Sequence, residues 1–286
     1  MTGRAPLGSV IIPAHDESGV IVRCLDALFE GAGPGELDVV VVCNGCVDDT
    51  AARARSSGHP VRVIELQHAS KPAALRAGDA AARTLPRLYL DADVVLPATA
   101  ARRVLQRLAE GAIAARPPVR YDSSGSSAAV RSYYRTRSRI PALLESLWGA
   151  GVYGLSRAGR SRFGDFPDVV GDDLWVDRHF ARHEIEIVDC APVVVAVPRR
   201  ARDLVRVLRR TYRGKAETAS VDPHDRARAT TATTLRQLRR LTATSPGAAL
   251  DAATYVAFAA GARLALAAPL SGERWERDES SRMAGP

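Results

Sequence analysis

An apolar run and a segment with helical periodicity alternate four times at the start of this chain. The apolar runs cover residues 9–13, 37–43, 61–66 and 88–91, and apolar side chains recur every three to four positions between them. Four such alternations predict a mostly parallel sheet with right-handed crossovers and helices on both faces. We therefore expect an α/β fold that binds its ligands at the carboxyl ends of the strands.

Polar side chains follow each predicted strand. His15 and Glu17 come after the first strand, Asn44 after the second, Lys71 in the loop after the third, and Asp91 after the fourth. Because parallel strands end at the same edge of a sheet, these side chains are expected to lie close together. Their convergence predicts the position of the ligand site.

Two carboxylates, those of Asp91 and Asp93, come where the fourth predicted strand ends. In an extended backbone alternate residues point to the same side, so both side chains are expected to leave the strand facing one way. Paired carboxylates repel each other, and a divalent cation that prefers oxygen ligands offsets that repulsion. The alternative is a pair of solvated aspartates in a turn, since Asp-x-Asp is short and common.

A second acidic pair, Asp172 and Asp173, follows Gly171. The glycine breaks the chain, and the two aspartates are expected in the first turn of a helix, where the helix dipole favours ionised carboxylates. A catalytic site and an ordinary helix with an acidic first turn both fit this pattern.

The charge balance predicts an anionic partner. Lysine and arginine number 40 against 32 acidic residues, giving a net charge of +8. A nucleotide diphosphate, a phospholipid surface and nucleic acid all qualify, but only 5% of residues are aromatic, which argues against single-stranded nucleic acid. Within residues 199–215, a helix would place on one face the side chains of Arg206, Arg209, Arg210 and Arg213. That face could hold a diphosphate, contact acidic lipid or be solvated.

The two ends of the chain bear on its location. Residues 1–9 lack the charged start and long apolar core of a signal peptide, so the cytosol is the expected compartment. Residues 248–270 are apolar but contain Asp251 and Arg263, which favours a packed or interfacial helix over a membrane span.

Cys43 and Cys46 have C-x-x-C spacing, yet no further ligands at a matching spacing follow, so we expect no zinc site there.

Five motifs, taken in order, resemble family 2 glycosyltransferases of GT-A fold. They are residues 10–17, 42–50, 71–78, 91–93 and 171–174. The resemblance implies inverting transfer of one sugar from a nucleotide-diphosphate donor of UDP or GDP type to an acceptor hydroxyl, assisted by Mn²⁺ or Mg²⁺. We expect a nucleotide-sugar-binding half over residues 1–120, an acceptor-binding and catalytic half over 121–215, and a helical tail over 216–286.

The resemblance also implies roles for single residues. Those expected to border the nucleotide sugar are Pro13, His15, Glu17, Asn44, Lys71, Asp91, Arg210 and Arg213. Asp91 and Asp93 resemble the carboxylates that hold the metal. Asp173 resembles the general base that takes the proton of the acceptor hydroxyl, and Asp172 would help to position the acceptor or the base.

Three departures from the family pattern limit the resemblance. Asn44 stands where an aspartate is usual, and Asp172 where glutamate is common. The Gln-x-x-Arg-Trp motif of processive members is reduced to residues 210–214, without the tryptophan, which argues against a polysaccharide synthase. A nucleotidyltransferase is an alternative, but its glycine-rich phosphate loop after the first strand is missing. A non-catalytic nucleotide-sugar-binding module is another, against which the retained aspartates argue.

Overall fold

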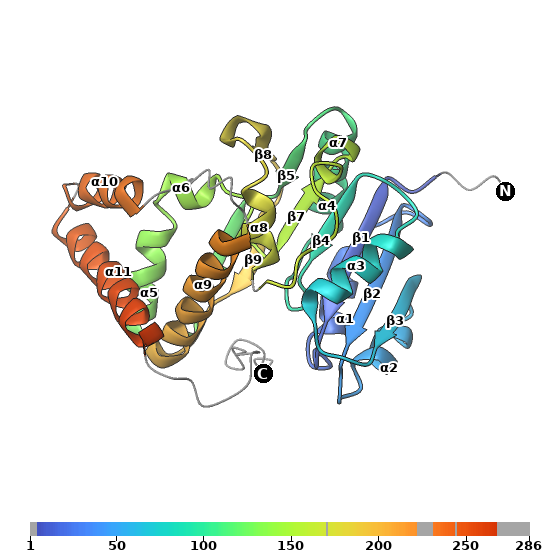
Figure 1. Ribbon diagram of the computed structural model, residues 1–286, viewed down its shortest axis with the longest axis horizontal. Helices are drawn as coiled ribbons and strands as arrows, with labels where there is room; N and C mark the ends of the chain where they lie inside the picture. Colours follow the sequence, from blue (N-terminus) through green and yellow to red (C-terminus); the bar gives the residue numbers. More distant parts are fainter. Residues whose placement is uncertain (1–4, 170, 222–230, 244, 268–286) are drawn as a thin grey trace. The chain divides into compact units, whose positions relative to one another are not determined.

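The computed structural model describes residues 5–169, 171–221, 231–243 and 245–267 (Figure 1). The chain forms two compact units. The first unit comprises Met1–Val119, Leu147–Asp168 and His179–Val195, and the second comprises Arg120–Ser146, Val169–Arg178 and Ala196–Pro286.

Within its described residues, the first unit contains a seven-stranded sheet of order β3-β2-β1-β4-β7-β5-β8. Neighbouring strands among β1 to β4 are parallel, whereas β7 is antiparallel to both β4 and β5. The strands are β1 (Gly8–Ala14), β2 (Leu37–Asn44), β3 (Val61–Leu66), β4 (Arg87–Leu90), β5 (Ala114–Arg116), β7 (Val152–Leu155) and β8 (Ile185–Ile187). The predicted mostly parallel sheet is confirmed.

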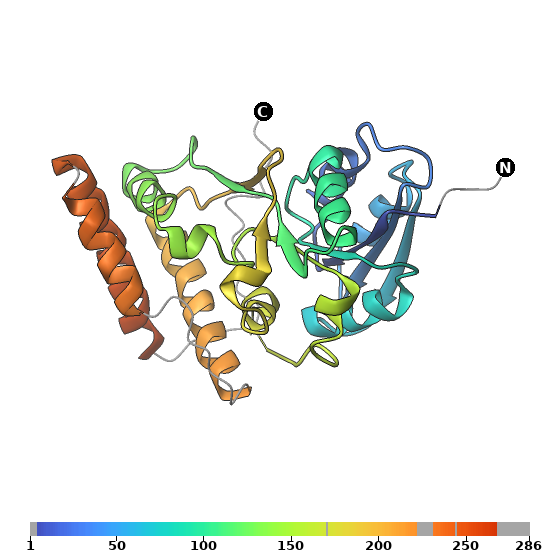
Figure 2. The same ribbon diagram turned by 90° about the horizontal axis from the view of Figure 1, so that it is seen from above.

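Helices cover both faces of this sheet (Figures 1 and 2). They are α1 (Ile21–Phe29), α2 (Thr50–Arg55), α3 (Lys71–Ala81), α4 (Ala98–Ala109) and the short α7 (Arg157–Arg160). Successive residues of β2 point to opposite faces: Val39 and Val41 join the core beneath α1, α2 and α4, while Val40 and Val42 pack against Ala74 of α3. Burial on both faces explains why β1 and β2 are continuous apolar runs in the sequence.

The strand order places the ligand site. The order places β2 and β3 on one side of β1 and β4 on the other, so the strand order reverses beside β1, and ligands bind such sheets at the carboxyl ends of the strands at this switch point. On one face of the sheet α3 approaches β1 so closely that a Cβ atom on Gly78 would collide with the side chain of Ile11. This contact fixes the helix that begins with Lys71.

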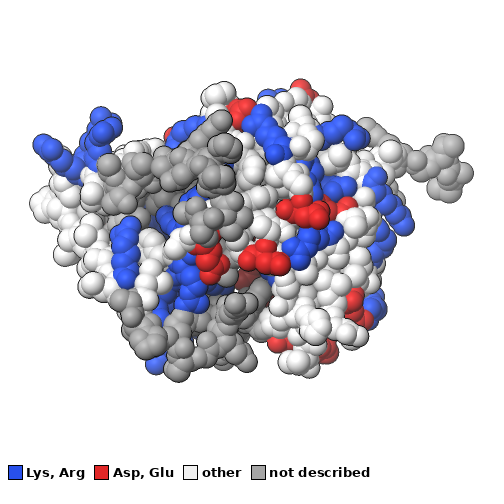
Figure 3. Space-filling view, in the orientation of Figure 1, with Lys and Arg blue, Asp and Glu red and all other residues white. Residues whose placement is uncertain are grey.

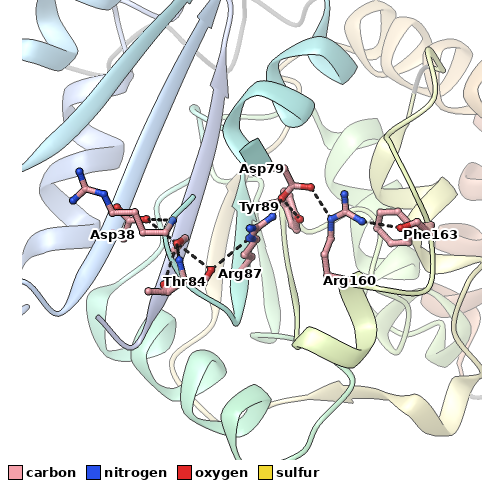
Figure 4. Close-up of polar contacts among 9 residues, drawn as sticks. Asp38, Asp79, Thr84, Arg87, Tyr89, Arg160 and Phe163 are labelled. Carbon is pink, nitrogen blue, oxygen red and sulfur yellow. Dashed lines mark hydrogen bonds and ion pairs between the residues drawn. The ribbon is translucent and has the colours of Figure 1, made fainter. Parts of the chain in front are cut away.

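A buried ionic network also ties α3 to the sheet (Figure 4). The Asp79 carboxylate, on α3, accepts hydrogen bonds from Arg87 Nη1 at 2.5 Å and Tyr89 Oη at 2.7 Å, both on β4, and from Arg160 Nε of α7 at 2.6 Å. The Arg160 guanidinium also lies over the ring of Phe163, 4.6 Å from its centroid. One carboxylate thus joins three elements of the first unit.

The second unit is mainly helical. Its described helices are α5 (Ala128–Arg137), α6 (Pro141–Leu144), α8 (Asp172–Asp177), α9 (Ala201–Val221), α10 (Thr231–Thr242) and α11 (Pro246–Leu264). The predicted tail helix, α11, packs on α5 and α9: Tyr255 stacks on Tyr133 with ring centroids 4.8 Å apart, and the Asp251 carboxylate accepts from Ser132 Oγ at 2.6 Å and from Arg135. The charged residue that argued against a membrane span therefore has a packing role.

From the sequence, Ser18 is expected to cap the first helix, residues 112–121 to form one strand and residues 130–148 to form a helix, and all three of these local predictions are wrong. Ser18 does not cap α1, which begins at Ile21; the Ser18 N–H instead donates to the Asp48 carboxylate at 3.1 Å. Residues 112–121 are not one strand, because Pro117 and its neighbouring proline separate β5 from β6 (Val119–Asp122), which pairs with β9 (Val193–Ala196) in a two-stranded sheet. The helical pattern over 130–148 divides into α5 and α6 at Pro141, since proline cannot continue a helix.

Candidate functional site

The carboxyl ends of β1 and β2 are joined by side chains that the sequence singled out. Pro13 lies near the end of β1, and His15, just beyond it, places Nδ1 2.6 Å from the Asn44 backbone oxygen. The Glu17 N–H donates to Oγ1 of Thr50, the first residue of α2, at 2.7 Å. Glu17 is buried. These contacts hold the loop after β1 against the loop after β2.

Asn44 is buried at the end of β2, and its side-chain amide binds backbone in two directions. Its Nδ2 donates to the Ala14 oxygen at 2.8 Å, and its Oδ1 accepts from the Ser70 N–H at 2.9 Å. An aspartate here could accept from Ser70 but could not donate to Ala14. The departure from the family pattern therefore has a structural reason: the amide fastens both the end of β1 and the entry to α3.

Lys71 and Asp91 form an ion pair at the same edge of the sheet. Lys71 is the first residue of α3, and Ser70 caps this helix by accepting from the Ala73 N–H at 3.2 Å. The Lys71 Nζ lies 2.7 Å from Asp91 Oδ1, and the Asp91 side chain is 40% exposed. The pair is thus fixed in position yet open to a ligand.

Asp91 and Asp93 lie in a turn, so the predicted extended backbone is wrong. The strand β4 ends at Leu90, and the Val94 N–H donates to the Asp91 oxygen at 3.1 Å. The Asp91 N–H in turn donates to the Gly151 oxygen at 2.8 Å. Gly151, the residue before β7, has φ +67°, and a Cβ atom there would collide with the Val94 side chain, so only glycine fits at this contact with the turn.

The ligand chemistry of this turn suits a hard divalent cation. Asp91 and Asp93 offer carboxylate oxygens, and Mg²⁺ is commonly held by one or two carboxylates together with the phosphate oxygens of a substrate. A separate group among the described residues has His15, Asp16 and Cys46 ligand atoms within 4.8 Å of one another. Its nitrogen and sulfur donors suit softer metals, so the aspartate pair is the better match to Mn²⁺ or Mg²⁺.

In the second unit, Asp172 and Asp173 occupy the first turn of α8, as the sequence predicted. Gly171 precedes them with φ +90°, a left-handed conformation that favours glycine. Asp172 is buried, while Asp173 is half-buried and accepts from the Leu174 N–H at 2.8 Å through Oδ1. On α9, Arg210 is exposed and Arg213 is half-buried.

Comparison with known proteins identifies the family. Residues 9–161 match the family described as Glycosyl transferase family 2, which is more than half of the chain. The chain belongs to glycosyl transferase family 2. All the candidate residues of the first unit fall within the matched range, whereas Asp172, Asp173, Arg210 and Arg213 of this glycosyltransferase lie beyond it.

Solved structures share the fold of this glycosyltransferase. One is a mannosyltransferase from Pyrobaculum calidifontis in complex with GDP-Man and Mn²⁺, with 21% identity and a TM-score of 0.65 over 92% of this chain and 87% of that one. Another is glucosyl-3-phosphoglycerate synthase from Mycobacterium tuberculosis in complex with Mn²⁺, UDP and glucosyl-3-phosphoglycerate, with 22% identity and a TM-score of 0.53 over 76% and 80%. No curated protein sequence matches this chain.

Two residues at the site of this glycosyltransferase were missed by the sequence analysis. Ser70 binds Asn44 and caps α3, and its place before Lys71-Pro72 is a helix-start signal that could have been recognised. Gly151 reaches the Asp91 turn only because β7 pairs with β4, and nothing in the sequence around it announces that pairing.

Proposed function

We propose that this glycosyltransferase transfers a single sugar from a UDP- or GDP-linked donor to an acceptor hydroxyl, with inversion at the anomeric carbon and with Mn²⁺ or Mg²⁺ as cofactor. The observation that carries the proposal is the ion pair of Lys71 and Asp91 at the switch point of a family 2 sheet, with Asp93 two residues beyond Asp91 in the same turn. Complexes of the similar proteins with GDP-Man or UDP and with Mn²⁺ support the donor and metal classes.

The first unit would bind the donor. Asp91 and Asp93 would hold the divalent ion, which when bound supplies Lewis-acid stabilisation of the departing diphosphate. Lys71 adds a positive charge beside Asp91 and contributes to nucleotide binding. Pro13, His15 and Glu17 would border the nucleotide at the end of β1.

Asn44 has a different part in this proposal from the one its place in the motif suggests. Both ends of its amide already bind backbone, at Ala14 and Ser70. We therefore assign to it the positioning of the two loops that line the nucleotide, and not a direct reading of the base.

The second unit would supply the base. Asp173 would accept the proton of the acceptor hydroxyl as that oxygen attacks the anomeric carbon on the face opposite the departing diphosphate, which produces inversion in one step. Asp172, buried beside it, would hold the first turn of α8 in place. Arg210 and Arg213 would contact the diphosphate or the acceptor. Much of the rate would then come from holding donor, acceptor and base in line.

We further propose that the enzyme acts in the cytosol and can contact membranes peripherally, and that nucleic acid is not its partner. None of the helices in the described ranges is both long and apolar enough to cross a bilayer. The support for peripheral contact is the exposure on α11 of Leu250, Val256 and Leu264.

Calorimetric titration with UDP, GDP and dTDP, each with and without Mn²⁺, tests the donor and metal assignments. We expect Mn²⁺-dependent binding of UDP or GDP, weakened at least about tenfold by Asp93→Ala, since each charged contact contributes about 1.5–3 kcal/mol. Asp49→Ala is the matched control, because Asp49 is an exposed aspartate paired with Arg53. Binding without any need for metal would refute the metal assignment and favour a non-catalytic nucleotide-sugar-binding module, whereas no nucleotide binding at all would refute the donor assignment.

Asp173→Asn tests the base. We expect sugar transfer to fall about 100-fold or more, with nucleotide binding unchanged, because general-base catalysis typically contributes ~10²–10⁴ in rate. Undiminished transfer in this variant would show that another group takes the proton.

A further inference from the structure

Cations gather around the ring of Tyr212 in the second unit. Tyr212 lies on α9, and the guanidinium carbon of Arg263, on α11, lies 4.4 Å from the centroid of its ring. Lys215 Nζ, one turn further along α9, lies 5.6 Å from the same centroid. Two positive side chains from two helices are therefore held against one aromatic ring.

Arg178, at the end of α8, brings a third positive charge to the same place. Its Nη2 lies 3.5 Å from the Lys215 backbone oxygen. Its Nη1 is buried and has no hydrogen-bond partner among the described residues. A buried guanidinium N–H group loses its hydration without compensation unless a ligand accepts from it.

The electrostatics of Lys215 show that these charges act on one another. Burial, followed by the charges of Arg137, Arg263 and Arg178, lowers the pKa of Lys215 to about 8. Arg137 comes from α5, where its Nε donates to Tyr121 Oη at 3.1 Å. Like charges brought together from four helices destabilise the ligand-free protein, and an anion among them would reverse that effect.

We propose that Arg178, Lys215 and Arg263, arranged around Tyr212, bind a phosphate group of a substrate. This inference rests on the proposed function, which offers two sources for the group: the diphosphate of the sugar donor and a phosphate ester on the acceptor. Guanidinium groups present paired N–H donors that match phosphate oxygens, and the lysine adds a point charge. Figure 3 shows basic side chains on the face where Figure 1 draws α9.

No sequence pattern could have assembled this set. The basic face predicted on α9 consisted of arginines at three- and four-residue spacing, and it did not include Lys215. Arg178 and Arg263 join it only through the packing of α8 and α11 against α9. The proposed phosphate site therefore consists of residues other than Arg210 and Arg213.

Titration of the full-length protein with glycerol 3-phosphate, in the absence of metal and nucleotide, tests the site. We expect measurable binding that weakens at least about tenfold in Arg263→Gln and in Lys215→Gln, as loss of a charged hydrogen bond implies. Arg202→Gln is the matched control: it removes the same charge from the first turn of α9, where the side chain is 67% exposed, and should change affinity less than about twofold. Arg263→Lys retains the charge and should recover much of the binding, and it remains informative if Arg263→Gln does not fold.

A second titration distinguishes the two sources of phosphate. Binding of glycerol 3-phosphate to protein saturated with Mn²⁺ and GDP or UDP would support an acceptor phosphate, whereas competition by the nucleotide alone would support the donor diphosphate. Equal affinities in wild type, Arg263→Gln and Arg202→Gln would overturn the inference. If the protein bound the nucleotide but not glycerol 3-phosphate, the phosphate-site inference would be overturned and the proposed function would stand. If it bound glycerol 3-phosphate but no nucleotide, the proposed function alone would be overturned.

Discussion

The buried carboxylate of Asp79 offers a direct test of what holds α3 in place. In Asp79→Asn the side chain keeps its shape but loses its charge, so one neutral amide replaces the group that accepts from Arg87, Tyr89 and Arg160. The Asp79 side chain is 7% exposed, and those of Arg87 and Arg160 are 16% and 18% exposed. Water therefore cannot replace the lost charge.

The magnitude follows from that burial. Removing one partner of a buried ion pair costs about 3–5 kcal/mol, and the asparagine oxygen can still accept one hydrogen bond, so we expect a loss near the lower end. Burial and the Asp79 charge raise the pKa of Tyr89, which keeps its hydroxyl protonated as a donor. Tyr89→Phe removes only that neutral hydrogen bond and should cost about 1 kcal/mol.

Urea unfolding followed by circular dichroism measures both changes. With an m value of about 3 kcal/mol per M, Asp79→Asn should lower the midpoint of the transition of the first unit by about 1 M. The control is Asp49→Asn, whose partner Arg53 is 52% exposed, and it should cost less than about 0.5 kcal/mol. If Asp79→Asn were no more destabilising than the control, the network in Figure 4 would not be what fixes α3.

Three further predictions concern stability. Gly78→Ala places a Cβ against Ile11 and should cost about 1–3 kcal/mol by thermal unfolding; an unchanged melting temperature would show that α3 can shift away from β1. The hydrogen bond from Arg162 lowers the pKa of Glu184 to about 2. The contribution of Glu184 to the free energy of unfolding is therefore complete above the ordinary carboxyl pKa and is lost as pH falls toward 2. Glu184→Gln should accordingly flatten the acid side of a curve of stability against pH. Lys215→Met should stabilise the free protein by about 1 kcal/mol below pH 8, where the wild-type side chain is charged, and the gain should vanish above pH 10; a loss of stability at pH 7 would contradict the charge argument.

Much of the first unit could be predicted from the sequence because its strands are buried on both faces. Such strands appear as nearly uninterrupted apolar runs, and β2, which is buried along its whole length, spans residues 37–44 where 37–43 were predicted. The polar residues after each strand could be placed as well, since parallel strands end at one edge. His15, Asn44, Lys71 and Asp91 accordingly meet through direct hydrogen bonds or through the loops those bonds hold.

The rest depended on contacts that no local pattern encodes. The Asp91 N–H donates to the oxygen of Gly151, just before β7. The Asn44 amide bonds to backbone groups of Ala14 and Ser70, which come together only in the fold. The charges around Tyr212 come from helices far apart in the chain. Predicting them would require the packing of the second unit.

The bond between Asp91 and Gly151 has a consequence for the order in which the protein can be completed during synthesis. The strands β1 to β4 are all made by residue 90, so the nascent chain can pair the central part of the sheet early. Gly151 emerges from the ribosome sixty residues after Asp91, and only then can β7 pair with β4 and close the turn that carries both carboxylates. A nascent chain that has reached β5 would thus have the loops after β1 and β2 in place before the turn that carries Asp91 and Asp93, and under the proposed function its affinity for metal would arise only after its nucleotide contacts.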